Sequence, residues 1–473
     1  MSAGALPDSG PAGPVPAPVA APVATAFSAW AAGLGPEAPP ARLREVFEFV
    51  LLDAIGLCVA AREADYLRAT LAACDSDGAC TAIGQARGLD PAGAALVNGT
   101  AIHGEDYDDT FEGTPVHSGA AIAPALLAAC EGYGLGGRDL LRGMAVGTEL
   151  MCRLALVAPT AVHRAGFHPT GVIGALGAAA GVAAALRLDA TRMASAIGIA
   201  GSFASGIIEY LAEGTWTKRL HPGWAAQAGL RAARLAQEGF LGPRTVIEGA
   251  HGFFKGFAAE GIARDYGQVT ERLGETWQAE NLAFKLYACG TMLAPFIDCA
   301  LRLRRDGLAP ADVETIVCKV GEGTVHRLWE PRAEKTAPST AYSAKFSGPF
   351  AIAVALTDGA AGLEQFTDAR AADPGLRALA ARIEHRIDPD NEYPRNYSGH
   401  LRARLRDGRT LEAEQPHLRG GRHAPLDRGQ LIEKMRANLA HGGWPAARAK
   451  QVDDFCRGIF DAPDLGALAA LRR

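Results

Sequence analysis

The stretch from His103 to His117 holds the densest group of chemically reactive side chains in the sequence. It reads HGEDYDDT from His103 to Thr110 and continues through Glu112 to His117, so five acidic residues and two histidines lie close together. Carboxylates and imidazoles exchange protons near neutral pH, which favours general acid–base chemistry. The plainer interpretation is an acidic loop in solvent. Apolar runs on both sides, AGAALVNGTAI before it and AAIAPALL after it, instead predict that the segment opens into the core.

Closely spaced carboxylates also suit a hard cation such as Mg²⁺ or Ca²⁺. The sequence lacks H-E-x-x-H, the segment lacks the glycine and final glutamate of an EF-hand loop, and no second acidic motif completes a metal-binding pair. We therefore expect no metal and no cofactor. A metal-dependent lyase or cyclase is the alternative from another enzyme class.

A second candidate is GFHPTG at 166–171, directly before a long run of alanine and glycine. Proline is favoured in the first turn of a helix, so Pro169 predicts a helix start and places His168 at the positive end of the helix dipole. That position suits a neutral histidine or one that contacts an anion. Capping of the helix by the ring is the structural alternative.

A third candidate, GTWTKRLHPG at 214–223, combines Lys218, Arg219 and His221 on an expected turn before another helix rich in small residues. Arginine offers a planar fork and lysine a point charge, so the pair suits carboxylate binding. A solvated basic turn is the alternative. The chain has no G-x-x-x-x-G-K-[ST] and no G-x-S-x-G motif, and its only G-x-G-x-x-G, at 132–137, follows a predicted helix.

The composition describes a folded globular protein with a large core. At 473 residues the chain exceeds the usual size of one domain, so we expect two. Hydrophobic residues make up 48% of the chain, and a net charge of -5 provides no basic field for a polyphosphate backbone. We expect no nucleic-acid partner. Nine scattered cysteines without a C-x-x-C pair predict reduced thiols and a cytoplasmic location.

The first half of the chain has a helical pattern. Residues 1–22 are rich in Ala, Pro and Gly, lack the charged start of a secretory signal, and are expected to form a disordered tail. From about Thr25 to Gln278, apolar residues recur at helical spacing. The clearest helices are predicted at 42–61, 118–133, 138–157, 171–186, 190–204 and 224–238. Ser118 is expected to cap the second of these, which places His117 just ahead of its N-terminus.

Residues 170–186 contain no charge and approach the length of a membrane span. Alanine and glycine make up most of this stretch, and they gain little from transfer into lipid but allow close helix packing. We therefore expect a buried helix and no membrane association.

After about Cys289 the pattern becomes a mixture of strands and helices, which indicates an α+β unit. Strands are predicted at 313–320, 381–387 and 400–406, and helices at 343–356 and 369–379. Two amphipathic helices at 428–439 and 446–460 are expected to pack back on the first domain. The predicted division is a helical part at 23–278, an α+β lid at 279–424 and C-terminal helices at 425–473.

Linked motifs make this chain resemble the MmgE/PrpD family. They are NGTAIHGEDYDDT with His117-Ser-Gly, then GFHPTG, then KRLHPGWAAQAG, then GFLGPRTVIEG followed by GFF. The resemblance covers nearly everything after about residue 25. That family includes 2-methylcitrate dehydratases, cis-aconitate decarboxylases and iminodisuccinate epimerases, which act on small polycarboxylates without an obligatory metal or organic cofactor.

The resemblance implies a mainly α fold, with a large all-helical domain and a smaller α+β lid domain, and a homodimer. By motif position it implies a set of active-site residues: Asp106, Thr110, His117, His168 and Lys218. It places three further groups beside them for substrate binding: Arg219, His221 and His103. The neighbouring Asp108 and Asp109 are interpreted as structural support.

The sequence departs from the family near the start of the lid. The family commonly has a histidine shortly after K-x-Y-x-C, whereas FKLYACGTMLAP places Ala294 there. Lys285 and Tyr287 in the same stretch are expected to line the pocket, with a structural role as the alternative.

Together these features predict a cofactor-independent lyase that acts on a proton next to a carboxylate. Lys218 and Arg219 would hold substrate carboxylates, His168 or Asp106 would act as base and His117 as acid. Dehydration of a small di- or tricarboxylate such as 2-methylcitrate is the favoured reaction. Decarboxylation of the cis-aconitate type and epimerisation of the iminodisuccinate type use the same groups. A non-catalytic polycarboxylate-binding protein is the alternative outside the enzymes.

Overall fold

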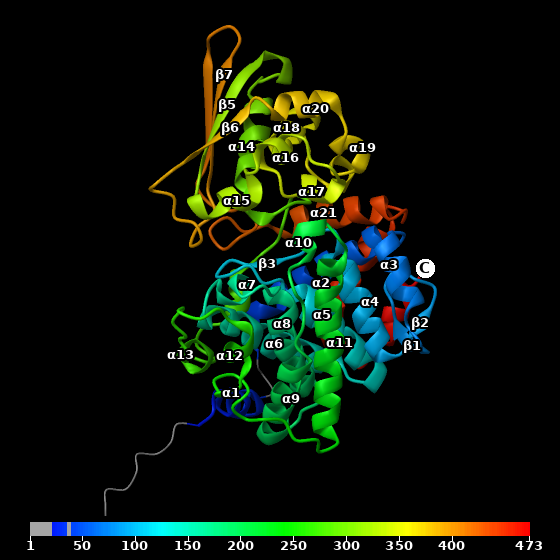
Figure 1. The fold of residues 1–473 in the computed structure, drawn as a ribbon. Helices are drawn as coiled ribbons and strands as arrows, with labels where there is room; N and C mark the ends of the chain where they lie inside the picture. The colour runs from blue at the N-terminus through cyan, green and yellow to red at the C-terminus, as the bar shows by residue number, and fades with distance from the viewer. Residues whose placement is uncertain (1–20, 36–38) are drawn as a thin grey trace, which may run out of the picture.

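The computed structural model describes residues 21–35 and 39–473, which form two bodies (Figure 1). The tail predicted at 1–22 lies outside the described residues except for its last two positions. A large helical body occupies the lower part of the view, and a smaller body of helices and one larger sheet stands above it. The fold is therefore mainly α with a smaller mixed part, as the sequence predicted.

The helical body contains the first thirteen α-helices in chain order. They are α1 (Val23–Ala32), α2 (Arg42–Ala61), α3 (Asp65–Ala72), α4 (Pro91–Gly104), α5 (Ser118–Tyr133), α6 (Gly137–Val157), α7 (Ala161–Arg164), α8 (Pro169–Ala185), α9 (Ala190–Phe203), α10 (Tyr210–Glu213), α11 (Thr217–Gln237), α12 (Phe253–Phe257) and α13 (Gly267–Thr270). Two short antiparallel strand pairs join them: β1 (Asp77–Thr81) with β2 (Gly88–Leu89), and β3 (Thr110–Phe111) with β4 (Leu282–Ala283). The first pair was not predicted, because DGACT has only one β-branched residue, Thr81, and begins with Asp and Gly, which are depleted in strands.

Helix α8 lies at the centre of the helical body. It packs against α5, α6, α9 and α11, and nearly all of its residues are buried, which confirms the predicted buried helix. Small residues allow the close approach: a Cβ on Gly181 of α8 would lie 2.8 Å from the carbonyl oxygen of Gly143 on α6. No helix in the described ranges is long and apolar enough to cross a membrane.

Helix α11 starts earlier than the sequence indicated. The prediction of a turn at 214–223 was wrong, because Lys218 and its neighbours occupy the first turns of the helix. The Pro-Gly pair at 222–223 had suggested a break, but proline removes only one backbone hydrogen bond. The glycine of that pair packs directly on α4, where a Cβ on Gly99 would lie 2.5 Å from its Cα.

The lid consists of a four-stranded sheet covered by helices. The strand order is β6 (Ile383–Ile387), β5 (Val313–Val320), β7 (Gly399–Leu405) and β8 (Thr410–Gln415), with β5 and β6 parallel and the other pairs antiparallel. The lid helices are α14 (Ala294–Arg305), α15 (Val325–Leu328), α16 (Arg332–Thr336), α17 (Ala341–Ala344), α18 (Gly348–Asp358), α19 (Asp368–Ala371) and α20 (Pro374–Ala380). Helix α14 packs against β7, β8 and α18.

One lid helix predicted from the sequence, 343–356, is in fact two. It divides into α17 and α18 because Ser347 caps the second helix, where its hydroxyl accepts a 3.0 Å hydrogen bond from the Phe350 N–H. Short 3-10 helices link many of the longer elements: Gln278–Asn281, Thr291–Leu293, Pro310–Asp312, Glu322–Thr324, Leu363–Gln365, Ile459–Asp461 and Gly466–Leu471.

The C-terminal helices α21 (Arg428–His441) and α22 (Arg448–Gly458) follow the lid and pack against α2 in the helical body. Lys434 of α21 is buried there, with its Nζ 2.6 Å from Asp53 Oδ1 on α2. The same ammonium donates a 2.7 Å hydrogen bond to the carbonyl of Tyr107. The C-terminal segment therefore holds the main chain of the acidic segment in place.

Candidate active site

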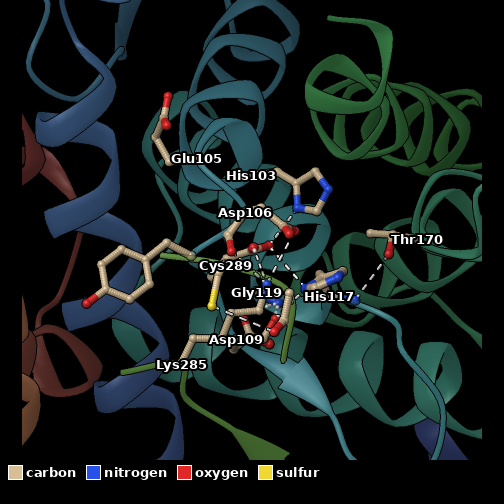
Figure 2. Close-up of polar contacts among 12 residues, drawn as sticks. His103, Glu105, Asp106, Asp109, His117, Gly119, Thr170, Lys285 and Cys289 are labelled. Atoms are coloured by element: carbon tan, nitrogen blue, oxygen red, sulfur yellow. Dashed lines mark hydrogen bonds and ion pairs between the residues drawn. The ribbon is translucent and has the colours of Figure 1, made fainter. Parts of the chain in front are cut away.

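The acidic segment is buried between the two bodies, which excludes the interpretation as a loop in solvent. Helix α4 carries His103 in its last turn, and Asp106 follows with φ 54°. Aspartate adopts this left-handed conformation more readily than most residues, and the Asp106 N–H donates a 3.0 Å hydrogen bond to the His103 carbonyl. Both side chains and those of Asp108 and His117 are buried. Figure 2 shows His103, Asp106 and His117 gathered around one space.

Asp109 caps α5, a role that the sequence assigned to Ser118. Its carboxylate oxygens accept hydrogen bonds of 3.0 and 3.1 Å from the Gly119 N–H and one of 3.2 Å from the Ser118 hydroxyl (Figure 2). A Cβ on residue 119 would lie 2.1 Å from Asp109 Oδ1, so glycine is needed there. The predicted Ser118 cap is wrong, because the N-cap is His117 and Ser118 lies in the first turn. Burial and the neighbouring Asp108 raise the pKa of Asp109 to about 7.

His117 is held by two hydrogen bonds. Its Nδ1–H donates to the Asp109 carbonyl (2.7 Å), and its backbone N–H donates to the Thr170 hydroxyl of α8 (3.2 Å). With Nδ1 serving as the donor, Nε2 is left as a proton acceptor. Burial lowers the pKa of His117 to about 3, so the ring is neutral at physiological pH.

Asp108 lies between two histidines. Its Oδ2 accepts a 2.8 Å hydrogen bond from His103 Nδ1 and lies 3.5 Å from His117 Nδ1. Burial alone would raise the pKa of Asp108, but the two imidazoles lower it below its ordinary value. Through this hydrogen bond Asp108 sets the orientation of His103 inside the site.

Two ammonium groups contact Asp106. Lys218 Nζ donates to Asp106 Oδ1 (2.8 Å), and Lys285 Nζ lies 3.3 Å from the same oxygen and donates to the Asp106 carbonyl (2.8 Å). Burial would raise the pKa of Asp106, but Lys218 and Lys285 lower it well below its usual range. Burial likewise would lower the pKa of Lys218, and Asp106 raises it. Asp106 and Lys218 are therefore both charged near neutral pH.

The pairing of β3 with β4 explains how Lys285 reaches this pocket. Thr110 of β3 is paired with Ala283 of β4, so the residues just after Ala283 run past the acidic segment. Figure 2 shows Lys285 approaching Asp106 from this separate strand of chain. Lys285 therefore lies beside Asp106.

His168 and His221 form the side of the pocket next to α8 and α11. His168 is the N-cap residue of α8 and is buried, and its Nδ1 lies 3.2 Å from Nδ1 of His221. Burial, followed by the nearby His103 and Lys218, lowers the pKa of His168 well below its usual value. Burial lowers that of His221 to about 4. Neither ring is charged near neutral pH.

Arg219 lies beside the pocket, and its guanidinium contacts two aromatic rings. Its guanidinium is 4.4 Å from the ring centroid of Tyr66 and 4.8 Å from that of Tyr342 in the lid. The nearby Glu105 carboxylate, 3.9 Å away, accepts a 2.6 Å hydrogen bond from Lys345 of the lid. The sequence had not singled out Lys345 or Tyr342, because they lie far along the chain in a stretch with no recognisable motif.

Thr110, Lys285, Tyr287 and Ala294 share a small apolar cavity. Tyr287 presents its ring to this space, while its hydroxyl donates a 2.6 Å hydrogen bond to Asp298. The small side chain of Ala294 thus borders open space where the family pattern has a histidine. Tyr287 is held in the lid by Asp298 and does not direct its hydroxyl to Asp106.

A metal is a poor fit to this set of side chains. Among the described residues, ligand atoms of His103, Asp108 and His117 lie within 4.8 Å of one another. However, His117 Nδ1 already donates to a carbonyl, and the ammonium of Lys285 lies 3.9 Å from Asp108 Oδ1. A fixed cation at this distance repels a second one. The donor set favours anion binding and proton transfer.

The fold and the site together define a two-body protein with a buried pocket of acid–base groups and paired cations. The MmgE/PrpD N-terminal domain matches residues 25–263, and the MmgE/PrpD C-terminal domain matches residues 287–455. The chain belongs to the MmgE/PrpD family.

Named relatives lie in fungi and mammals. The chain is 27% identical to the cis-aconitate decarboxylase-like protein oryM of Aspergillus oryzae, over 93% of this chain and 95% of the relative. It is 26% identical to a cis-aconitate decarboxylase of Aspergillus terreus, over 93% and 94%. It is 30% identical to the human cis-aconitate decarboxylase, over 74% and 73%. Decarboxylation, the activity for which these relatives are named, is a lyase reaction.

Proposed function

We propose that this chain is a cofactor-independent lyase that decarboxylates a small unsaturated tricarboxylate of the cis-aconitate type. The observation that carries the proposal is the pair of ammonium groups, Lys218 and Lys285, within 3.3 Å of one oxygen of Asp106 in a buried pocket. Fixed cations in a site of low dielectric stabilise negative charge that develops during a reaction. The decarboxylase relatives support the same reaction class.

Decarboxylation breaks a carbon–carbon bond and leaves an electron pair on carbon as CO₂ departs. The charge spreads toward a neighbouring carboxylate of the substrate, which Lys218 and Lys285 would contact. One proton then bonds to the carbon. The balance is one carboxylate and one proton consumed, and one C–H bond and one CO₂ formed, in each turnover.

The hydrogen bonds of the two histidines suggest their roles in this reaction. His117 keeps its proton on Nδ1, so its Nε2 is an acceptor that orients the substrate or removes a proton. His168 has no hydrogen bond at Nε2 within the described part of the chain, and in its Nε2–H form it supplies the proton to carbon. From the sequence, His168 or Asp106 had been expected to act as the base and His117 as the acid. Thr110 and Arg219 would bind and orient the substrate.

Dehydration of a 2-methylcitrate-like substrate is the second candidate, and the acceptor at His117 Nε2 favours it. Elimination removes a proton from carbon and a hydroxyl from its neighbour, so it releases water and consumes no net proton. Epimerisation, in which the proton returns to the other face, uses the same groups.

We also propose that the chain forms a homodimer through the face made by α9, α10 and α11. In the described structure, eight of the nine exposed large hydrophobic side chains lie on this stretch: Phe203, Ile207, Leu211, Trp216, Trp224, Leu235, Phe240 and Leu241. Such a concentration of exposed apolar side chains in one segment favours an interaction surface there. Light scattering should give twice the chain mass of 49.2 kDa for the native protein and a lower mass for Leu211→Lys/Trp224→Lys. A monomeric native protein at micromolar concentration would contradict the proposal.

The reaction is tested by incubating the enzyme in D₂O with cis-aconitate, 2-methylcitrate, citrate and iminodisuccinate, with NMR detection of each. We expect cis-aconitate to lose CO₂ and to gain one deuteron on carbon. Loss of water from 2-methylcitrate alone would establish the second candidate. Binding of the compounds without turnover of any would identify a non-catalytic polycarboxylate-binding protein and overturn both.

A further inference from the structure

Four histidine rings form a continuous row from the centre of the pocket to its edge. The ring centroids of His117 and His103 lie 4.8 Å apart, those of His103 and His168 5.4 Å, and those of His168 and His221 5.3 Å. The rings come from α4, α11 and the N-caps of α5 and α8. Burial keeps His117, His168 and His221 neutral near neutral pH, and a neutral imidazole has one donor and one acceptor nitrogen.

The last step of the row is a direct contact. Nδ1 of His168 and Nδ1 of His221 lie 3.2 Å apart, so one of them carries a proton and the other accepts it. Gly206 maintains the contact: its carbonyl accepts a 2.8 Å hydrogen bond from the His168 N–H. Its φ is 130°, and a Cβ there would lie 3.1 Å from the His221 ring. A residue with a side chain would therefore disturb the histidine pair.

His221 also borders a cavity with a volume of about 480 Å³. Glu209, Tyr210 and Glu213 contribute polar groups to its wall. The ring of Tyr210 lies 5.9 Å from that of His221. The cavity is open to the surface, so water can reach the His221 ring. His221 is therefore the point at which the buried histidine row meets a space that can supply protons.

We propose that His221 is the entry point of a proton relay. The relay carries protons from this cavity to His168 and replaces the proton that His168 gives to the substrate. The proposal rests on the proposed decarboxylation, because that reaction consumes one proton in every turnover and the buried pocket must receive it from outside. Dehydration and epimerisation consume no net proton and do not need such a path.

The transfer balances as a concerted exchange along the pair. His168 gives its Nε2 proton to the substrate carbon and accepts at Nδ1 the proton that His221 held on its own Nδ1. His221 then takes a proton at Nε2 from water in the cavity. One proton enters, one leaves on the product, and both rings stay neutral. Rotation or tautomer exchange of the rings restores the starting arrangement.

The groups that face His221 are consistent with this role. Lys218 is a cation one turn away on the same helix, and it disfavours a lasting positive charge on His221. Glu209 and Glu213 also line the cavity, and their carboxyl groups can hold water beside the ring. The apolar face proposed to meet a second copy includes Ile207 and Trp224 on the cavity wall, so dimerisation would shelter this water from bulk solvent.

The test compares His221→Asn, His221→Ala and the control Tyr210→Phe, which alters the same cavity wall without removing an imidazole. Decarboxylation is followed by CO₂ release. We expect His221→Asn to lower kcat by about 10-fold or more with KM little changed, since asparagine keeps a polar group near His168 but cannot relay a proton. Added imidazole should restore much of the kcat of His221→Ala, and Tyr210→Phe should stay close to the wild type.

Wild-type kcat in His221→Asn would overturn the relay, and so would a loss in His221→Ala that imidazole does not restore. Either result would leave the proposed decarboxylation intact, because the wild-type enzyme would still release CO₂. Failure of the wild-type enzyme itself to release CO₂ from the tricarboxylate would instead overturn the proposed function and the relay with it.

Discussion

Lys218 Nζ donates a 2.8 Å hydrogen bond to Asp106 Oδ1 across 112 positions of the sequence. The contact joins the start of α11 to the left-handed residue after α4, and it keeps both groups charged although both are buried. A substrate carboxylate that enters the pocket must share this ammonium with Asp106. The free energy of the Lys218–Asp106 ion pair is therefore linked to the affinity of the site for substrate.

Asp106→Asn should destabilise the ligand-free protein and increase the stabilisation that a bound polycarboxylate provides. The change leaves Lys218 and Lys285 buried without their carboxylate, at a cost of about 3 kcal/mol. Citrate can replace the missing charge. Thermal unfolding should show a larger citrate-induced rise in Tm for the variant than for the wild type, and equal rises would contradict the role of this cation pair in anion binding.

Substitutions of Asp109 should show how much its capping of α5 contributes to the stability of the protein. Asp109→Ala removes the acceptor at the N-terminus of α5, and we expect a loss of about 1–2 kcal/mol in the free energy of unfolding. Asp109→Asn keeps an acceptor oxygen and should lose less. Urea unfolding of both variants provides the measurement, and equal losses would show that the capping contact contributes little.

His117 should make the protein less stable in mild acid. Its pKa is about 3 in the folded state and about 6.5 when unfolded, so below pH 6.5 the unfolded chain binds a proton that the folded chain excludes. Stability is therefore complete above pH 6.5 and falls as the pH drops toward 3. Between pH 7 and pH 5 this one ring accounts for about 2 kcal/mol.

The control for this pH effect is His117→Asn, which has no titrating group at the position. Urea unfolding at pH 7, 6 and 5 should show a shallower loss for the variant than for the wild type, with the remaining slope due to other buried histidines such as His168. Parallel curves for the two proteins would mean that His117 titrates normally in the folded state.

Removal of metal ions should leave turnover unchanged. Lys285 lies 3.9 Å from Asp108 Oδ1, where it opposes a cation among His103, Asp108 and His117. Activity should be the same before and after dialysis against EDTA. A loss on dialysis that Mg²⁺ restores would establish the metal-dependent alternative.

Much of the framework could be predicted from the sequence, because its signals are local. Helices α2 and α5 and strand β5 lie at the predicted positions, since apolar spacing and flanking breaks mark them within a few residues. The segment from His103 to His117 was also recognisable, because its reactive groups are neighbours in the chain. The sequence could further indicate its burial from the apolar runs beside it.

Other features depend on contacts between distant residues and left no local trace. The sequence favoured Ser118 as the cap of α5, but Asp109 folds back over the helix end and takes its place. Lys345 and Tyr342 reach the pocket margin from the lid, and nothing in their own stretch indicates this. The contact between His168 and His221 similarly requires the packing of α8 on α11.

The central claim is that a buried set of cations and imidazoles acts on a polycarboxylate, and turnover of Lys218→Ala and His117→Ala tests it most directly. Both variants should remain folded, as judged by circular dichroism, and NMR should show kcat on the substrate identified by the panel lowered by about 100-fold or more in each. Turnover close to that of the wild type in both folded variants would contradict the account.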